Sequence, residues 1–249
     1  MKTCVWLWFM GTLMGCGGFV AAAEEIVYLD ATFDDKTIDQ AIGTGGAALG
    51  EPIKVDAGVT AVVRATPFGS PSLEVQDAAD AAGRVTFEFL EDAEVTTGLV
   101  VVAMDLWFTG DADVNQQAVV YLREHGFSGW QFLNMFFWGT GEINVGTETD
   151  WANGLGPYPF GQAFTLLIVV NMDTGLISGW LDGELLFSDL EHGVVGRGIG
   201  RVEIGMVSDT DRVPTIWVDR LRVSNTPPDT PAVPTTWGAV KSLFRVATR

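Results

Sequence analysis

Cysteine is almost absent from this chain of 249 residues, and the little there is lies at one end. Cys4 and Cys16 both fall within the first 23 residues, so residues 24–249 can form neither a disulfide nor a cysteine-bound metal site. Without such staples the apolar core must carry the stability alone. About 200 residues suffice for that, because one sandwich domain of this size buries a large core.

Positive charge is also scarce. The chain carries 14 Lys and Arg residues against 32 Asp and Glu residues, a formal net charge of −18 at pH 7. Nucleic acids and anionic membrane surfaces are polyanions, so this imbalance argues against both as partners. It does not by itself indicate a cationic ligand, since high net charge often serves only solubility.

The first 23 residues read as an export signal. Lys2 provides the positive start, Val5–Met14 an apolar stretch, and Ala21–Ala23 a small-residue cleavage site. An alternative lies within it, because Leu13–Cys16 resembles a lipoprotein box with Cys16 as the lipidated residue. We therefore expect an exported protein, secreted or at the cell surface, with a lipid anchor as the alternative. The apolar stretch is short and broken by glycine, so we expect no membrane span.

The other end changes character after Asn225. Residues 226–234 are rich in proline and predict a stiff, extended linker. Residues 235–249 form a short basic tail in which Trp237, Val240 and Phe244 share one side of a helix. Such a tail resembles the sorting or docking tails of secreted bacterial proteins. A helix packed on its own domain and a disordered end are equally compatible with the pattern.

Residues 24–225 show almost no helical periodicity and many strand signals. Val85, Phe87 and Phe89 alternate with polar neighbours, which places one side of that strand in a core. The aromatic run Phe127–Trp138 is too apolar for a sheet edge and indicates a central strand. About a dozen strands separated by Gly, Asn, Asp and Pro turns predict one all-β domain, an antiparallel two-sheet jelly-roll sandwich.

The stretch Phe164–Phe187 predicts a three-stranded meander. Leu166–Val170 is a continuous apolar run typical of a strand buried on both faces. A turn at Asn171–Gly175 leads into Leu176–Leu181, and Asp182-Gly183 is a two-residue hairpin signal. A meander cannot bury its apolar side alone, so we expect other strands to cover it.

The hairpin residues Trp180–Gly183 resemble the central hairpins of laminin G-like domains, which belong to the concanavalin A-like lectin/glucanase sandwiches. Phe33–Asp35, Ile42–Gly46 and Gly50–Pro52 are similar to the opening of many bacterial members, and Ile216–Val223 resembles their closing strand. The resemblance implies a concanavalin A-like fold. It leaves the function open, since lectins, hydrolases, lyases and adhesion modules share this architecture.

A hydrolase of this superfamily would need an E-x-D-x-x-E motif, in which residues two apart on a strand put two carboxylates on one side. The nearest match begins with Glu148 and Asp150, but Asn153 replaces the final acid. An acidic loop leading into Trp151 is the simpler interpretation. The chain also has no G-x-S-x-G, H-E-x-x-H, P-loop or dinucleotide-binding pattern.

A lyase would need a base and a group that neutralises a uronic carboxylate. Tyr121, Arg123 and His125 are the candidates, and His125 and His192 are the only histidines. Tyr121 and Arg123 would share a strand face, whereas His125 falls at an expected turn. If the protein is an enzyme, we expect its catalytic residues among these three, Glu148 and Asp150; otherwise there are none.

Calcium is the cofactor that the resemblance suggests, because sandwiches of this superfamily often carry a structural Ca²⁺. Asp34 and Asp219 are similar in placement to its ligands, near the first and last strands. Hard oxygen ligands suit this ion. An Asp in such a loop is more often simply a turn former.

Exposed aromatic residues suggest a binding function. The Gly- and Pro-rich loop 151–161 holds Trp151, Tyr158 and Phe160, with Asn153 as a polar partner. Rings on a rigid loop offer stacking surfaces for sugars. Trp130, in the aromatic run, is a further candidate. Alternatively, Trp151 and Tyr158 plug the open end of the sandwich.

The sequence thus favours an exported, non-catalytic, lectin-like domain that binds a glycan or a partner at an extracellular surface. A polysaccharide hydrolase or lyase with an unusual acid–base arrangement is the second hypothesis. A structural module of the cell surface is the third.

Overall fold

The computed structural model describes residues 24–65, 67–77, 83–109, 116–126, 131–206 and 215–227. The expectations for the export signal and Cys16, for Trp130, and for nearly all of the linker and tail therefore lie outside the described residues. Within the described ranges, no helix has both the length and the apolar character needed to span a membrane. The elements are β1 (Val27–Thr32), η1 (Ala47–Leu49), β2 (Lys54–Val55), β3 (Val59–Arg64), β4 (Ser72–Asp77), β5 (Gly83–Glu88), η2 (Leu90–Asp92), β6 (Leu99–Thr109), β7 (Gln116–Arg123), β8 (Gln131–Trp138), β9 (Ile143–Gly146), β10 (Trp151–Ala152), β11 (Ala163–Asn171), β12 (Leu176–Leu181), β13 (Glu184–Glu191), β14 (Arg201–Met206) and β15 (Thr215–Ser224).

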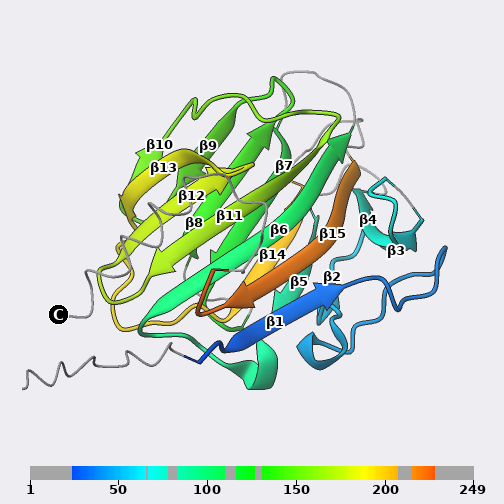
Figure 1. Cartoon of the computed structure of the whole chain (residues 1–249), viewed down its shortest axis with the longest axis horizontal. Coiled ribbons are helices and arrows are strands. Elements are labelled where there is room, and N and C mark those ends of the chain that lie inside the picture. The colour runs from blue at the N-terminus through cyan, green and yellow to red at the C-terminus, as the bar shows by residue number, and fades with distance from the viewer. Residues whose placement is uncertain are drawn as a thin grey trace, which may run out of the picture.

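The strands form two antiparallel sheets that lie as layers one over the other (Figure 1). Sheet A has the order β13-β12-β11-β6-β15-β4-β3, with β1 also paired to β15. Sheet B has the order β10-β9-β8-β7-β14-β5-β2. The predicted all-β, two-sheet jelly-roll sandwich is therefore confirmed.

The meander is confirmed as β11, β12 and β13, which pair in succession. Asp182 and Gly183 both have positive φ, 48° and 81°, as a two-residue hairpin turn requires. Leu166–Val170 is buried on both faces. One side enters the main core, and Leu167 and Val169 on the other side contact Trp180 and neighbouring apolar residues of β6.

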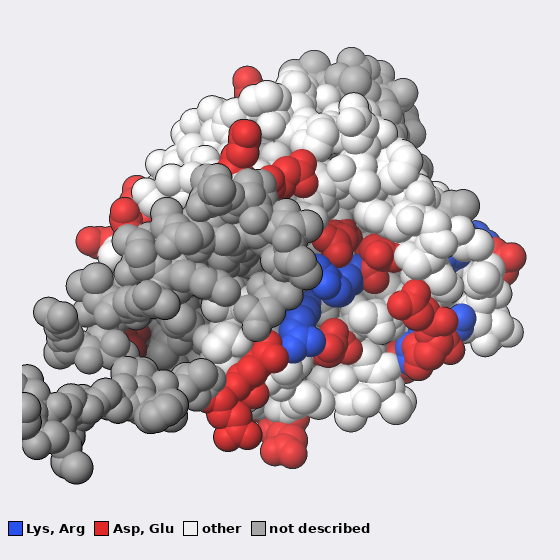
Figure 2. Space-filling model, in the orientation of Figure 1, with Lys and Arg blue, Asp and Glu red and all other residues white. Residues whose placement is uncertain are grey.

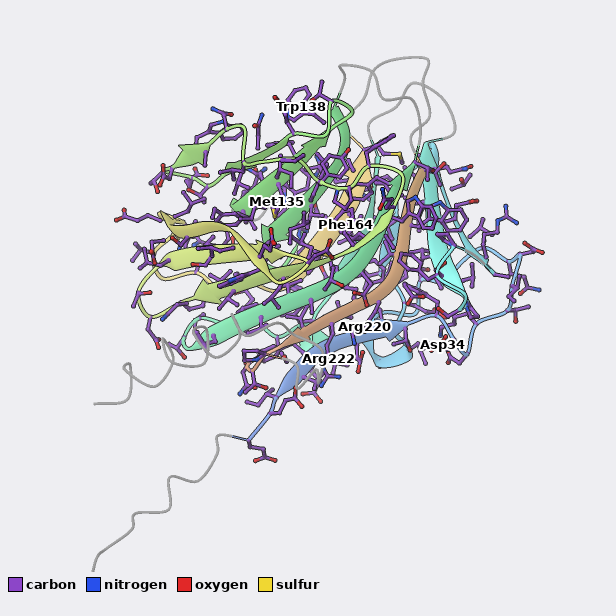
Figure 3. The ribbon with its side chains drawn as sticks, turned by 45° about the horizontal axis from the view of Figure 1, so that its top comes forward. Asp34, Met135, Trp138, Phe164, Arg220 and Arg222 are labelled. Carbon is purple, nitrogen blue, oxygen red and sulfur yellow. The ribbon has the colours of Figure 1, made fainter. Side chains whose placement is uncertain are left out.

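The main core lies between the sheets. Met135 of sheet B and Phe164 of sheet A both point into it (Figure 3). Four rings form its aromatic centre, with Phe108 4.9 Å from Phe137, 5.2 Å from Phe164 and 5.8 Å from Tyr158 between ring centroids. Offset and edge-on ring contacts of this kind add to the stabilisation from burial.

The chain closes on β15, whose two halves have different neighbours on one edge. Residues Thr215–Val218 pair with β4, and Arg220–Ser224 pair with β1. The change coincides with a register shift between Val218 and Arg220 in the pairing with β6, so Asp219 is the residue at the bulge.

One local expectation is confirmed within the described residues, and another needs correction. The aromatic run does supply an interior strand, but β8 is described only from Gln131 onward. The residues at the start of loop 151–161 form the short edge strand β10, which pairs with β9. The two residues of β10 lie in a Gly- and Pro-rich segment, and two residues are too few to show the alternation that predicts a strand.

Tyr158 is not an exposed ring, and the expectation that it stacks on a ligand at the surface is wrong. Its side chain is 3% exposed, and its hydroxyl donates a hydrogen bond of 2.9 Å to the Trp138 carbonyl. It therefore plugs the core, as the alternative interpretation had it. Burial raises the pKa of the Tyr158 phenol well above its ordinary value.

Replacing Tyr158→Phe tests this placement. At neutral pH we expect a loss of about 1 kcal/mol in the free energy of unfolding, because one partly buried hydrogen bond disappears. The pKa is raised in the folded state, so wild type loses stability as pH rises through the unfolded value of about 10. That loss reaches about 1 kcal/mol near pH 10.6, so the difference between the two proteins should close there and reverse by about 0.4 kcal/mol at pH 11. Urea titrations at neutral pH and at pH 11 measure it.

Tyr28→Phe, at a partly exposed ring, is the neutral-pH control. Equal urea midpoints for wild type and Tyr158→Phe at neutral pH, with parallel pH curves, would contradict the buried placement.

Candidate functional site

The outer face of sheet B, turned away from sheet A, carries a row of directly paired residues, one from each strand. The register pairs Lys54 with Thr86, Thr86 with Glu203, Glu203 with Tyr121, Tyr121 with Asn134, Asn134 with Gly146, and Gly146 with Trp151. Directly paired residues of antiparallel strands project to the same side. With strands about 4.8 Å apart, this cross-strand row extends about 29 Å from Lys54 to Trp151.

Trp151 ends the row as a half-exposed ring. Its side chain is 50% exposed, and its ring lies 5.6 Å from Phe136 between centroids. A Cβ added at Gly146 would come within 2.0 Å of the indole, so the ring rests directly on the glycine backbone. The indole nitrogen donates a hydrogen bond to the Asn153 side chain. These contacts fix the orientation of the ring while leaving half of it open to solvent.

Tyr121 occupies the middle of the row between two guanidinium groups. Arg84 and Arg123 each lie 4.7 Å from the centroid of its ring, and Phe136 meets it edge-on at 6.2 Å. Cations at this distance are attracted to the ring face. Burial raises the pKa of Tyr121, and the two arginines partly oppose that rise. Ring contacts thus run from Trp151 through Phe136 to Tyr121, whose own ring is buried.

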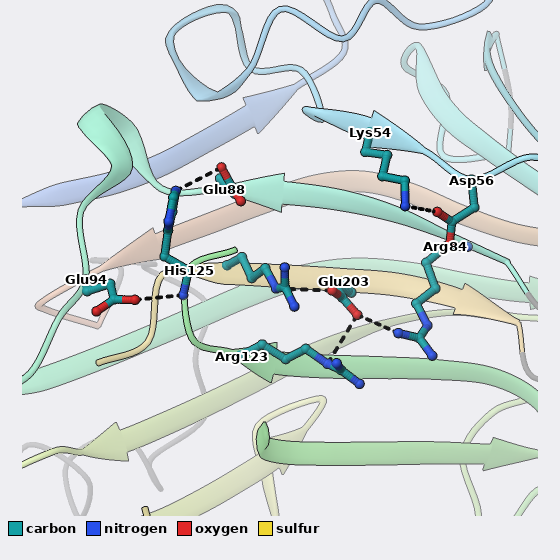
Figure 4. Close-up of polar contacts among 9 residues, drawn as sticks. Lys54, Asp56, Arg84, Glu88, Glu94, Arg123, His125 and Glu203 are labelled. Atoms are coloured by element: carbon teal, nitrogen blue, oxygen red, sulfur yellow. Dashed lines mark hydrogen bonds and ion pairs between the residues drawn. The ribbon is translucent and has the colours of Figure 1, made fainter. Parts of the chain in front are cut away.

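Glu203 holds the arginines in place. Its carboxylate lies 3.0 Å from Arg84, 3.3 Å from Arg123 and 3.1 Å from Arg201 (Figure 4). Glu203 is 3% exposed and Arg201 is fully buried. Burial lowers the pKa of Arg123 and of Arg201, and Glu203 counteracts it in both. Removing the carboxylate would leave buried cations uncompensated, which typically costs about 3–5 kcal/mol.

Asn134 is the polar residue between Tyr121 and Trp151 in the row. Its side-chain oxygen is buried and has no hydrogen-bond partner among the described residues. Buried polar atoms are nearly always hydrogen-bonded, so this unsatisfied acceptor is unusual.

The structure does not place all the predicted binding residues at one site. Trp151 and Asn153 remain together at the surface, as expected. Phe160 packs partly buried against the core, beside the buried Tyr158. The row members Asn134 and Glu203, and Phe136 beside them, were not predicted. Their only sequence signal is a polar residue or a ring at an outward position of an otherwise apolar strand.

The predicted catalytic residues do not form one centre. Glu148 and Asp150 lie in a bend between β9 and β10 and not on a strand. Their spacing of two residues therefore does not place the two carboxylates on one strand face, as a hydrolase motif requires. Asp150 instead accepts a hydrogen bond of 2.8 Å from the Trp151 backbone. This agrees with the simpler interpretation, an acidic loop leading into Trp151.

The three residues considered for a lyase do not form one site either. Tyr121 and Arg123 share a face, as predicted, and His125 follows β7 at a bend, also as predicted. His125 contacts Glu88 and Asp92 at 3.2 and 3.4 Å. The hydrogen bonds and ion pairs of the described residues do not connect it to Tyr121.

The described residues do not place Asp34 and Asp219 in a cluster of calcium ligands. Asp34 is exposed in the turn that follows β1 (Figure 3), and Asp219 at the β15 bulge accepts a hydrogen bond of 2.7 Å from Ser70. Among the described residues, neither belongs to a group of three side chains that could share an ion. Calcium at Asp34 and Asp219 stays a prediction.

The outer face of sheet A presents a different surface. Acidic side chains there surround a few basic ones (Figure 2). Arg220 lies 3.3 Å from Asp105, and Arg222 lies 2.8 Å from Asp30 and 3.0 Å from Glu25. Because each of these two arginines faces at least one carboxylate, they form no cationic patch for a polyanion among the described residues of this face.

Comparison with known proteins identifies the fold and no family. No family model matches the chain, and no curated protein sequence matches it. The cellulose induced protein Cip1 shares the fold with a TM-score of 0.53 at 18% identity, over 80% of this chain and 97% of Cip1. Endo-β-1,4-glucuronan lyase from the fungus Trichoderma reesei gives 0.52 at 10%, over 77% and 95%.

A third similar structure is botulinum neurotoxin type C, whose cell entry depends on interaction with two ganglioside molecules. It gives a TM-score of 0.54 at 11% identity, over 90% of this chain and 51% of the toxin chain, so this chain spans about half of that length. At such identities these likenesses establish a shared β-sandwich fold.

Proposed function

We propose that this protein is an exported, non-catalytic glycan-binding domain of lectin-like type, with its ligand lying across the outer face of sheet B. The observation that carries the proposal is the cross-strand row, which ends in the half-exposed indole of Trp151. A ring held in this way can stack on a sugar, because it pays little further conformational entropy on binding.

The rest of the row supplies polar partners. The partly exposed Arg84 offers donors beside the Tyr121 ring, and Asn134 adds a partly exposed amide between Tyr121 and Trp151. Binding sites for small polar molecules combine aromatic surface with a few such fixed polar groups. The sandwich is a rigid support, so the spacing between indole and amide is set by strand register and not by loop motion.

The non-catalytic part of the proposal rests on how the acid–base candidates are distributed. Glu148 and Asp150 belong to the loop before β10, whereas His125 faces Glu88 and Asp92 at the far side of the sheet. General acid–base catalysis needs such groups within hydrogen-bond reach of one substrate position. Burial also raises the pKa of Tyr121, which makes its phenol a weaker candidate for a base at neutral pH.

Two lines outside this site support the proposal. The export signal expected in the first 23 residues would bring the domain to extracellular glycans. The fold is shared with a glucuronan lyase and with a toxin that interacts with gangliosides, so it is an architecture on which carbohydrate sites occur. The similarity to laminin G-like domains remains a proposal of the same kind.

Trp151→Ala tests the indole. We expect wild type to be retarded in native gels cast with at least one polysaccharide from a panel of neutral and uronate-containing polymers. The variant should lose at least about fivefold in affinity, since removal of a stacking aromatic ring costs about 1–3 kcal/mol. Leu185→Ala is the matched control, because Leu185 is 58% exposed on β13 of the other sheet.

Retention that survives Trp151→Ala would contradict the site. New reducing or unsaturated ends released by wild type from any polymer of the panel would contradict the non-catalytic assignment.

Gly146→Ala tests the contact between the Trp151 indole and the Gly146 backbone. The added methyl would displace the Trp151 ring, so we expect weaker binding of the same polysaccharide with little change in the urea midpoint. Gly154→Ala is unsuitable as a control because its φ is positive, at 63°. Thr149→Ala, in the exposed bend before β10, is the better comparison. Equal gel retardation for wild type and Gly146→Ala would show that the ring position does not matter.

A further inference from the structure

A group of three side chains outside the cross-strand row converges at one end of sheet B. Glu88 is the last residue of β5, Asp92 is the last residue of η2, and His125 follows β7 (Figure 4 shows Glu88 and His125). Their ligand atoms, one from each side chain, all lie within 4.8 Å of one another. The group therefore joins three separate segments of the chain.

We propose that Glu88, Asp92 and His125 bind a divalent transition-metal cation of the zinc type. The Nε2 atom of His125 lies 3.2 Å from a Glu88 oxygen and 3.4 Å from an Asp92 oxygen. Around a tetrahedral ion with ligands at about 2.0–2.1 Å, neighbouring ligand atoms are separated by about 3.3 Å. The observed separations match that value.

The Nε2 atom of His125 faces two carboxylates. Nε2 is buried and makes no hydrogen bond among the described residues, although it lies between two carboxylates. The backbone N–H of His125 donates a hydrogen bond of 2.9 Å to Glu94. A Cβ added at Gly200 would lie 2.9–3.1 Å from atoms of His125, so the chain approaches closely here. These contacts hold the His125 backbone, and the ring itself contacts the two carboxylates.

The two carboxylates are held by different means. Glu88 is 7% exposed and is fixed by its place in an interior strand of sheet B. Asp92 is exposed and has a φ of 54° directly after Glu91 at 57°. Two successive residues in the left-handed region turn the chain back, which brings an Asp92 oxygen to 3.4 Å from Nε2 of His125.

The types of the three ligand atoms indicate which class of ion would bind. Two carboxylates and one imidazole supply three ligands and leave a fourth position on the exposed Asp92 side, where water could complete a tetrahedron. Ca²⁺ prefers six to eight oxygen ligands, which this group does not provide. Glu88 also interacts electrostatically with the buried Arg201, so its charge is shared between that guanidinium and the ion. A protonated His125 paired with both carboxylates would satisfy the same distances, so the experiment has to separate these two states.

Calorimetric titration with ZnCl₂ in a buffer with excess Ca²⁺ provides the test, since Ca²⁺ saturates weak acidic sites. We expect one equivalent of Zn²⁺ bound, and visible d–d absorption of four-coordinate type when Co²⁺ is used as the probe. Loss of a ligand in His125→Ala or Asp92→Asn should lower the Zn²⁺ affinity by at least about 100-fold, the upper end of the effect of an outer-sphere contact. Zn²⁺ should raise the melting temperature of wild type and of neither variant.

Glu91→Gln is the matched control, because it removes one negative charge next to Asp92 without touching the group. It should bind Zn²⁺ as wild type does. Asp92 is exposed, so Asp92→Asn tests the proposal even if His125→Ala does not fold. Equal Zn²⁺ affinity in wild type and Asp92→Asn, or no four-coordinate Co²⁺ spectrum, would overturn the metal site. The glycan-binding proposal would be unaffected, since its residues lie elsewhere on the sheet.

Discussion

The alternation of side chains along the strands of sheet B is the constraint on which the rest of this structure depends. One side of each strand is buried against sheet A, so the opposite side is free to carry rings and charges. A slip of one residue in any pairing would place charged groups in the core and apolar groups outside. The inward residues include Phe87, Val120, Met135 and Ile204, and their outward neighbours are Thr86, Tyr121, Asn134 and Glu203.

The ion network around Glu203 reinforces that register. Glu203 on β14 meets arginines from β5 and β7 on either side and Arg201 on its own strand. A buried carboxylate surrounded by guanidinium groups is satisfied only in one alignment of the three strands, so the network specifies the pairing even if its net stabilisation is small. The same alignment brings Tyr121 and Asn134 into line with Trp151, and it places Glu88 at the end of β5 opposite the His125 bend. The two proposed sites thus share one structural cause.

Most of the fold could be predicted from the sequence, and most of the candidate site could not. The Asp182-Gly183 turn and the alternation from Val85 to Phe89 are local signals, because turn geometry and side-chain period act over a few residues. The cross-strand row joins positions 86, 203, 121, 134 and 146, which become neighbours only through the sheet order. Tyr158 and Trp151 lie in one loop with similar surroundings in sequence, yet one is buried and the other is half exposed. The difference in burial between Tyr158 and Trp151 comes from contacts with strands distant in the sequence, and no local sequence pattern predicts it.

The central claim is that recognition takes place on the outer face of sheet B. Hydroxyl-radical footprinting tests it most directly, with oxidation measured by mass spectrometry in the presence and absence of the polysaccharide that best retards the protein in native gels. We predict that the polysaccharide protects Trp151 and Phe136 on sheet B and leaves the oxidation of Leu185 on sheet A unchanged. Unchanged oxidation of Trp151 at saturating polysaccharide, with protection of sheet A instead, would contradict the account.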